Sequence, residues 1–250
     1  MRSLAHASNE LHLDLSSAIR TWWCQERHNS NVLVAGKKLI EICAEFLRES
    51  LPDRKRARYG DVEYDWEYRV DTSSANVSWR ARLIGLLNSP YQPVEPELFR
   101  EMMNRLAIDF RQFTFIDIGS GKGRALLLAS EFAFLRIIGI ELLPELNRIA
   151  EENIRKFSDR HTRCESIEAI CGDAMKFPFP EVQLVVFVNN PLPEPGLRKL
   201  ISNLENSLSM KPRPLFVVYA NPVLEQVLSD SHLLRKIFGT HQHAVFQGGT

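Results

Sequence analysis

FIDIGSGKGRALLLAS, residues 115–130, is the stretch that decides the fold. An apolar run reaches an acid at Asp117, continues into glycines at positions 119, 121 and 123, and resumes as the apolar pattern of a helix. A strand that leads through such a turn into a helix is the first half of a βαβ unit. Glycine permits positive φ and lets a ligand approach bare backbone. In an open α/β sheet ligands bind beyond the carboxyl ends of the strands, so the stretch predicts a ligand site at Gly119–Gly123.

The rest of the chain continues the alternation of strands and helices. Strand-like runs occur at 113–118, 136–142, 167–171, 183–189 and 214–220, and helical patterns at 123–133, 144–158, 196–209 and 222–231. Only a few residues join the last two runs, Leu233–Phe238 and Ala244–Gln247, which suits an antiparallel hairpin. We therefore predict an α/β fold with a doubly wound, mostly parallel sheet of seven strands that ends in an antiparallel hairpin.

The first 90 residues have a different pattern. Helical periodicity covers 10–28 and 32–49, whereas the charged and aromatic segment 53–72 suits short strands or an ordered loop. A turn-rich linker at 88–96 leads into a helix at 96–107. We expect a mainly helical extension over 1–90, used for substrate selection or as a cover, and an α/β domain over 91–250.

Composition limits the function classes. The 250 residues carry 31 basic and 31 acidic side chains, so no overall field attracts the chain to nucleic acid or anionic lipid, although Arg54–Arg58 is a local basic patch. The four cysteines form no C-x-x-C pair and have no clustered histidine partner, which predicts reduced thiols and no metal site. No apolar run approaches the length of a membrane span, and the N-terminus lacks a signal-peptide core. We expect a cytoplasmic protein without a membrane partner.

Three ligands compete for the glycine turn. A P-loop needs G-x-x-x-x-G-K-[ST], which the residues after Gly119 do not match. A dinucleotide fingerprint needs glycine where Arg124 stands, although Arg124 could also be a surface residue of the first helical turn. Asp117 would oppose a pyrophosphate but suits a ligand with an ammonium group. The methionine part of S-adenosylmethionine carries that ammonium and no phosphate.

From about residue 91 to 248 the chain resembles the class I, Rossmann-like S-adenosylmethionine-dependent methyltransferases. Asp117–Gly123 matches the motif that wraps the methionine part in that family, and Ile138–Glu141 matches the strand whose final acid binds the ribose hydroxyls. Cys171–Ala174 matches the turn that contacts adenine, and Phe187–Pro191 the strand end that faces the methyl group. The resemblance implies S-adenosylmethionine as cofactor, bound by Asp117, Gly119, Ser120, Gly121, Gly123, Glu141, Leu142, Asp173, Ala174 and Asn189.

The segment 189–193 bears on the methyl acceptor. It is similar to the Asn/Asp-Pro-Pro-aromatic signature of methyltransferases acting on adenine or glutamine, but Leu192 and Pro193 depart from it. A second partial likeness is to the non-SET histone lysine methyltransferases, which also have paired asparagines after a Phe-Val strand. These likenesses imply an amine acceptor, on a protein or small molecule more than on nucleic acid. They imply catalytic roles for Asn189 and Asn190, and substrate contacts for Tyr91, Glu95 and Pro191.

Other interpretations stay open at this point. Glu141 also suits the ribose of a dinucleotide. Asp173 could serve as a turn cap without binding a ligand, and Asn189 and Asn190 could serve as turn-forming residues without a catalytic role. The alternatives are therefore an NAD(P)-dependent oxidoreductase and a non-catalytic adaptor with a methyltransferase fold, whose N-terminal helices would form its interface.

Overall fold

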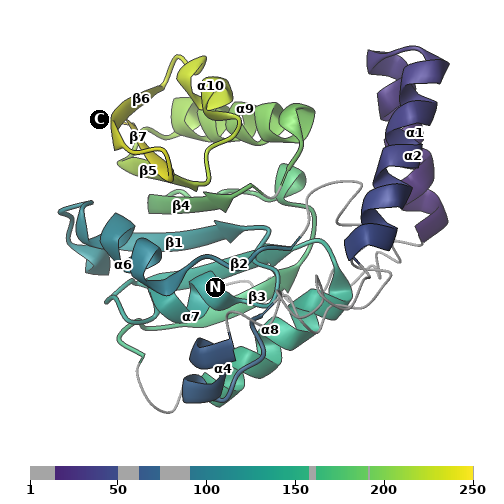
Figure 1. Ribbon diagram of the computed structural model, residues 1–250. Helices are drawn as coiled ribbons and strands as arrows, with labels where there is room; N and C mark the ends of the chain where they lie inside the picture. Colours follow the sequence, from purple (N-terminus) through teal and green to yellow (C-terminus); the bar gives the residue numbers. More distant parts are fainter. Residues whose placement is uncertain (1–14, 50–61, 74–90, 158–161, 191, 250) are drawn as a thin grey trace.

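The computed structural model describes residues 15–49, 62–73, 91–157, 162–190 and 192–249 (Figure 1). The basic patch at residues 54–58 and the first residues of the linker, 88–90, lie outside the described residues. None of the helices in the described ranges is both long and apolar enough to cross a membrane.

One sheet of seven strands runs through the molecule in the order β3-β2-β1-β4-β5-β7-β6. β1 to β5 are parallel, and β7 pairs antiparallel with both β5 and β6. The strands span Phe113–Ile118 (β1), Arg136–Glu141 (β2), Ile167–Cys171 (β3), Gln183–Asn189 (β4), Leu215–Ala220 (β5), Leu234–Gly239 (β6) and His243–Gly248 (β7). The predicted mostly parallel sheet with its terminal hairpin is confirmed, with strand ends within about one residue of the prediction.

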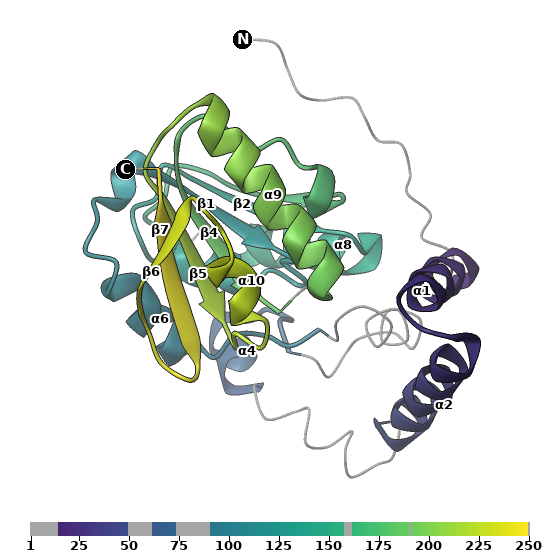
Figure 2. The same cartoon turned by 90° about the horizontal axis from the view of Figure 1, so that it is seen from above.

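Helices cover both faces of the sheet, as expected of a doubly wound fold (Figures 1 and 2). Side chains alternate between faces along a strand, so Phe115 of β1 packs in one core and Ile116 in the other. The Phe115 core receives α6 (Pro96–Asn104), α7 (Arg124–Ala129) and α8 (Pro144–Phe157). The Ile116 core receives α9 (Glu194–Met210) and α10 (Glu225–Ser229). Every residue of β1 and of β5 is buried, so both strands contribute side chains to both cores.

The N-terminal region is helical in its described parts, with α1 (Leu15–Asn29), α2 (Val32–Glu49) and α4 (Val62–Tyr68). The prediction of strands or a loop in 53–72 is therefore wrong for 62–68. Tyr64 and Tyr68 are four residues apart, which puts them on one side of a helix, and their ring centroids lie 4.7 Å apart. Tyr68 also contacts Phe157 of α8 at 5.3 Å, so tertiary packing stabilises this short helix.

The α1–α2 pair lies to one side of the sheet, towards the carboxyl ends of its strands (Figures 1 and 2). Trp22 is buried in a small cluster with Trp23 of α1 and with Leu39 and Ile42 of α2. Leu143, which follows β2, packs against the same cluster. The first helices therefore contact the α/β unit beside the end of β2, where the sequence predicts a ligand.

Candidate functional site

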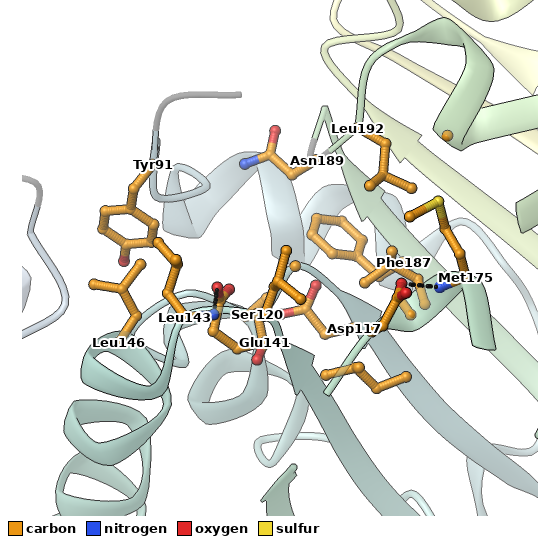
Figure 3. Close-up of a pocket in the computed structure, with 18 of the residues that line it drawn as sticks. Tyr91, Asp117, Ser120, Glu141, Leu143, Leu146, Met175, Phe187, Asn189 and Leu192 are labelled. Atoms are coloured by element: carbon orange, nitrogen blue, oxygen red, sulfur yellow. Dashed lines mark hydrogen bonds between the residues drawn. The ribbon is translucent and has the colours of Figure 1, made fainter. Parts of the chain in front are cut away.

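A pocket opens at the carboxyl ends of β1, β2 and β4 (Figure 3). Nine of the residues singled out in the sequence line it: Tyr91, Asp117, Gly119, Ser120, Glu141, Leu142, Asp173, Ala174 and Asn189. Among the described residues, Glu95, Gly121, Gly123 and Asn190 do not line it, and Pro191 lies outside the described residues. Side chains far apart in the sequence thus meet at one edge of the sheet, as the strand-end motifs predict.

The glycine turn takes a backbone path that ordinary residues rarely adopt. Gly119, Gly121 and Gly123 have φ of 72°, 53° and 85°. The N–H groups of Gly119 and Ser120 both donate to the Ile140 carbonyl, at 2.9 and 3.1 Å, which ties the turn to the end of β2. At Gly121 an added Cβ would lie 2.1 Å from the Tyr91 ring. The Tyr91 ring therefore covers Gly121, which explains why Gly121 is not part of the pocket wall.

Two acids define the electrostatics of the pocket. Glu141 is 7% exposed, and its carboxylate accepts hydrogen bonds from the Gly121 and Leu143 backbone N–H groups, both at 2.8 Å. Burial raises the pKa of Glu141. Asp117 is 3% exposed, and within the described residues no donor reaches its carboxyl. Burial, and after it the nearby charge of Glu141, raise the pKa of Asp117 to about 8. The pocket thus holds a buried acid to which none of the described residues donates a hydrogen bond.

Ser120 gives a second sign of an incomplete site. Its hydroxyl is buried and has no hydrogen-bond partner among the described residues. A buried hydroxyl without a partner costs free energy, on the order of 1–3 kcal/mol. Ser120 is also a residue of the pocket wall, although its hydroxyl is turned towards Gly139 of β2.

The turn after β3 places Asp173 on the pocket wall and also gives it a capping role. Asp173 is the N-cap of the short helix η4 (Ala174–Lys176), where its Oδ1 accepts the Met175 N–H at 2.9 Å. Lys176 lies 3.4 Å from Oδ2. A carboxylate with one backbone donor retains acceptor capacity for a ligand, so the cap and a binding role are compatible.

The two asparagines at the end of β4 are held by neighbouring groups. Asn189 donates from Nδ2 to the Gln92 carbonyl at 2.9 Å and accepts at Oδ1 from Asn221 at 3.1 Å. Asn190, with φ of 50°, accepts at Oδ1 from the Tyr219 hydroxyl at 2.6 Å. Asn189 therefore joins the pocket wall to the segment before α6, whereas the Asn190 amide points to the β5 side.

The two upstream residues predicted to contact substrate differ in position. Tyr91 lines the pocket, donates its hydroxyl to the Thr72 carbonyl at 2.6 Å, and has its pKa raised by burial. Glu95 is the N-cap of α6 and accepts the N–H groups of Glu97 and Leu98. Its carboxylate stabilises the helix start rather than the pocket.

Much of the wall consists of residues that the sequence analysis did not identify. Apolar side chains come from Leu143, Leu146, Met175, Phe187 and Leu192 (Figure 3), and Gln25 comes from α1. Arg124 also lines the pocket and is only 2% exposed, so its interpretation as a surface residue is wrong. The apolar residues after the strand ends carried a usable signal, because a residue that follows a buried strand at the ligand edge faces the site.

Comparisons with known proteins identify a methyltransferase domain in this part of the chain. Residues 116–191 match the family model described as a methyltransferase domain. A search of curated proteins found no match. Similar solved structures include an RNA methyltransferase from Salinibacter ruber in complex with S-adenosyl-L-homocysteine, at 19% identity over 63% of this chain and 92% of that one, with a TM-score of 0.44. The putative methyltransferase yhhF from Escherichia coli has 19% identity over 64% and 90% of the two chains, with a TM-score of 0.46.

TrmN from Thermus thermophilus is a further similar structure, at 20% identity and a TM-score of 0.44. The similarity covers 62% of this chain and 49% of TrmN. At these scores the solved structures carry no argument about the acceptor. The family match is of more use, because its range contains the glycine turn, Glu141, Asp173 and the two asparagines.

Proposed function

Because residues 116–191 of the chain match a methyltransferase domain, we propose that its pocket binds S-adenosylmethionine and transfers the methyl group of this cofactor to an amine, on a protein or on a small molecule. The cofactor would lie with its methionine part at Asp117–Ser120, its ribose at Glu141 and its adenine at Asp173 and Ala174. Gly121 and Gly123 would act by shaping the turn, and Leu142 and Asn189 by closing the wall.

The observation that carries the proposal is the buried acid at Asp117. Within the described residues nothing donates to its carboxyl, and burial holds its pKa near 8. Such a group is stabilised by a cation that enters with the ligand. S-Adenosylmethionine brings an ammonium and a sulfonium that favour the ionised form of Asp117, whereas a dinucleotide brings phosphates whose negative charge disfavours it.

The acceptor class follows from which titratable groups line the pocket. Those on the described wall are Tyr91, Asp117, Arg124, Glu141 and Asp173, with no histidine, cysteine or lysine among them. The Tyr91 hydroxyl already donates a hydrogen bond to the Thr72 carbonyl. The three acids of this wall are the groups proposed to bind the cofactor, so the described wall leaves no further side-chain base for an alcohol or phenol and favours an acceptor that presents a lone pair as a neutral amine.

Bound S-adenosylmethionine supplies a methyl group that is already activated by positive charge on sulfur. The work left to the chain is to orient the acceptor and exclude water. Phe187, Leu192 and Met175 give the pocket an apolar side that would exclude water. Asn189 and Asn190 are held by their side-chain hydrogen bonds. They would fix the conformation of the backbone at the end of β4, against which the acceptor amine would lie.

The extension over 1–90 would select the substrate. Gln25 of α1 is part of the pocket wall, and Trp22 and Trp23 pack near Leu143 at its edge. These contacts support an α/β unit over 91–250 with a substrate cover in front of it. The four cysteines are free thiols, which supports a reducing compartment such as the cytoplasm.

Titration calorimetry on the full chain tests the cofactor assignment. We expect S-adenosylhomocysteine to bind with micromolar affinity and NAD not to bind, and we expect Asp117→Ala to weaken binding of the former. Binding of NAD alone would refute the proposal, and unchanged binding in Asp117→Ala would refute the placement of the methionine part.

A screen for labelled methyl transfer, with protein, nucleic acid and small-molecule fractions, tests the acceptor. Label is expected in an amine of the protein or small-molecule fraction, and Asn190→Ala should depress its transfer more than it weakens cofactor binding. Label found only in nucleic acid, or on oxygen, would contradict the proposed acceptor.

A further inference from the structure

The glycine turn contains two fully buried cations. Lys122 and Arg124, on either side of Gly123, are 0% and 2% exposed. Lysine and arginine are almost never buried to this extent without partners, because removing their charge from water is costly. Their partners therefore indicate what this turn is built to hold.

The partners come from Asp65–Ser73, which we name the N-terminal strap. Lys122 Nζ lies 2.7 Å from Asp71 Oδ1 and donates to the Ser73 carbonyl at 2.9 Å. Arg124 donates from Nε to the Thr72 hydroxyl at 2.6 Å, and its NH2 group lies 3.4 Å from Asp65 Oδ1. Each cation of the turn is thus paired with an acid of the strap, more than 50 residues away in sequence.

The strap is itself rigidly held. Asp65 accepts the Thr72 and Ser73 N–H groups at 2.8 and 2.7 Å and the Thr72 hydroxyl at 2.5 Å. Asn153 of α8 accepts the Asp71 N–H at 2.9 Å and donates to the Asp71 and Lys122 carbonyls at 2.8 and 2.9 Å. The Arg124 guanidinium also lies 4.8 Å from the centre of the Tyr64 ring. Strap, turn and α8 form one polar network, which is buried at Lys122, Arg124 and Asn153 and partly exposed at Asp71.

The same network reaches the pocket through Tyr91. Its hydroxyl donates to the Thr72 carbonyl of the strap, and its ring lies against Gly121 and on the pocket wall. Gly121 in turn donates its N–H to Glu141. The strap is therefore connected, through the turn and Tyr91, to the residues proposed to bind the cofactor.

We propose that the strap is a working part of the cofactor site, in which Asp65 and Asp71 are positioning residues that fix the glycine turn and the Tyr91 ring. Their second effect is on charge. By pairing with Lys122 and Arg124 they neutralise both cations of the turn, so that Asp117 and Glu141 dominate the pocket and a cationic ligand is favoured over a phosphate. This inference rests on the proposed function of the pocket.

The test measures S-adenosylhomocysteine affinity by calorimetry, with circular dichroism melts to show that each variant is folded at the assay temperature. Asp71→Asn and Lys122→Gln each break the ion pair, and Tyr91→Phe removes only the hydroxyl that reaches Thr72. Asp109→Asn is the matched control, because Asp109 also pairs with an arginine, at 2.9 Å, but lies before β1 at the opposite end of the strand.

We expect Asp71→Asn, Lys122→Gln and Tyr91→Phe each to raise the Kd by about tenfold, the order expected for a lost hydrogen bond that positions a site. The double variant Asp71→Asn/Lys122→Gln should lose no more than either single variant, because both act through one pair. The control should stay within about twofold of the wild type. A strap that served stability alone would lower the melting temperature and leave the Kd of the folded protein unchanged.

Kd values within twofold of the wild type in Asp71→Asn, Lys122→Gln and Tyr91→Phe would overturn the inference. If Asp71→Asn does not fold, Tyr91→Phe still decides, since a single hydroxyl is lost. A wild-type chain that binds no S-adenosylhomocysteine would instead contradict the proposed function itself, so the two failures are distinguishable.

Discussion

Ligand affinity should depend on pH through Asp117, and the dependence can be calculated. The pKa of Asp117 is raised to about 8 in the ligand-free site, whereas a carboxylate paired with an ammonium has a lowered pKa. The cationic ligand therefore prefers the ionised acid, and binding at neutral pH must release a proton. Affinity should rise with pH and level off above the pKa of the free site.

The magnitude follows from the ionised fraction of Asp117 before binding. With a pKa of about 8, roughly a hundredth of the molecules are ionised at pH 6 and roughly a tenth at pH 7. The Kd of S-adenosylhomocysteine should fall about tenfold between these two values, the equivalent of ~1.4 kcal/mol. Close to one proton, about 0.9, should be released on binding at pH 7.

Calorimetry in buffers of different ionisation enthalpy measures both quantities. Asp117→Asn should abolish the slope and the proton release, because an amide does not titrate. Asp109→Asn should retain both, since its hydrogen bonds with Arg111 lower the pKa of Asp109 to about 2, far below the range measured. A wild-type Kd that is constant from pH 6 to 7, with no proton released, would refute the assignment of Asp117 as the partner of the ligand's cation.

Two further predictions concern stability. Gly123→Ala should destabilise the fold by about 1–3 kcal/mol in urea unfolding, because φ is 85° and the new Cβ would lie 3.1 Å from the Ala150 Cβ. Gly36→Ala on α2, where an added Cβ meets nothing within 4 Å, should instead stabilise the fold by up to about 1 kcal/mol. Equal effects of the two substitutions would contradict the conformational argument. Tyr219→Phe should cost about 1 kcal/mol or more, because the hydroxyl donates to Asn190 and also accepts from the Leu224 N–H at 3.3 Å. The Kd of S-adenosylhomocysteine should stay within about twofold, so a large loss of affinity would mean that these contacts belong to the cofactor site.

The sheet could be predicted from the sequence because its evidence is local. The central parallel strands β1, β4 and β5 are nearly continuous apolar runs, and being buried on both faces they admit few polar residues. The helix at 62–68 could not be predicted in the same way. Its seven residues are too few to show a period, and its stability comes from the contacts of Tyr64 and Tyr68 with each other and of Tyr68 with Phe157.

The residues of the candidate site also divide into those that a local sequence pattern indicates and those that no local pattern indicates. Asp117, Glu141 and Asp173 were found because a strand end and its following turn fit within one short motif. The contacts of Lys122 with Asp71 and of Arg124 with Thr72 join segments that no local pattern relates. Gln25 was missed for the same reason, since nothing in α1 indicates that it lies at the ligand edge of the sheet.

The order of the last strands affects how the chain is made. β7 follows β6 in the sequence, yet it lies between β5 and β6 in the sheet. On the ribosome, β5 and β6 therefore emerge before the strand that joins them. Until His243–Gly248 has emerged, β5 has an open edge and β6 has no partner strand, and unpaired edges of this kind readily pair with other chains. A pause or truncation before His243 should thus produce an aggregating species rather than a smaller stable enzyme.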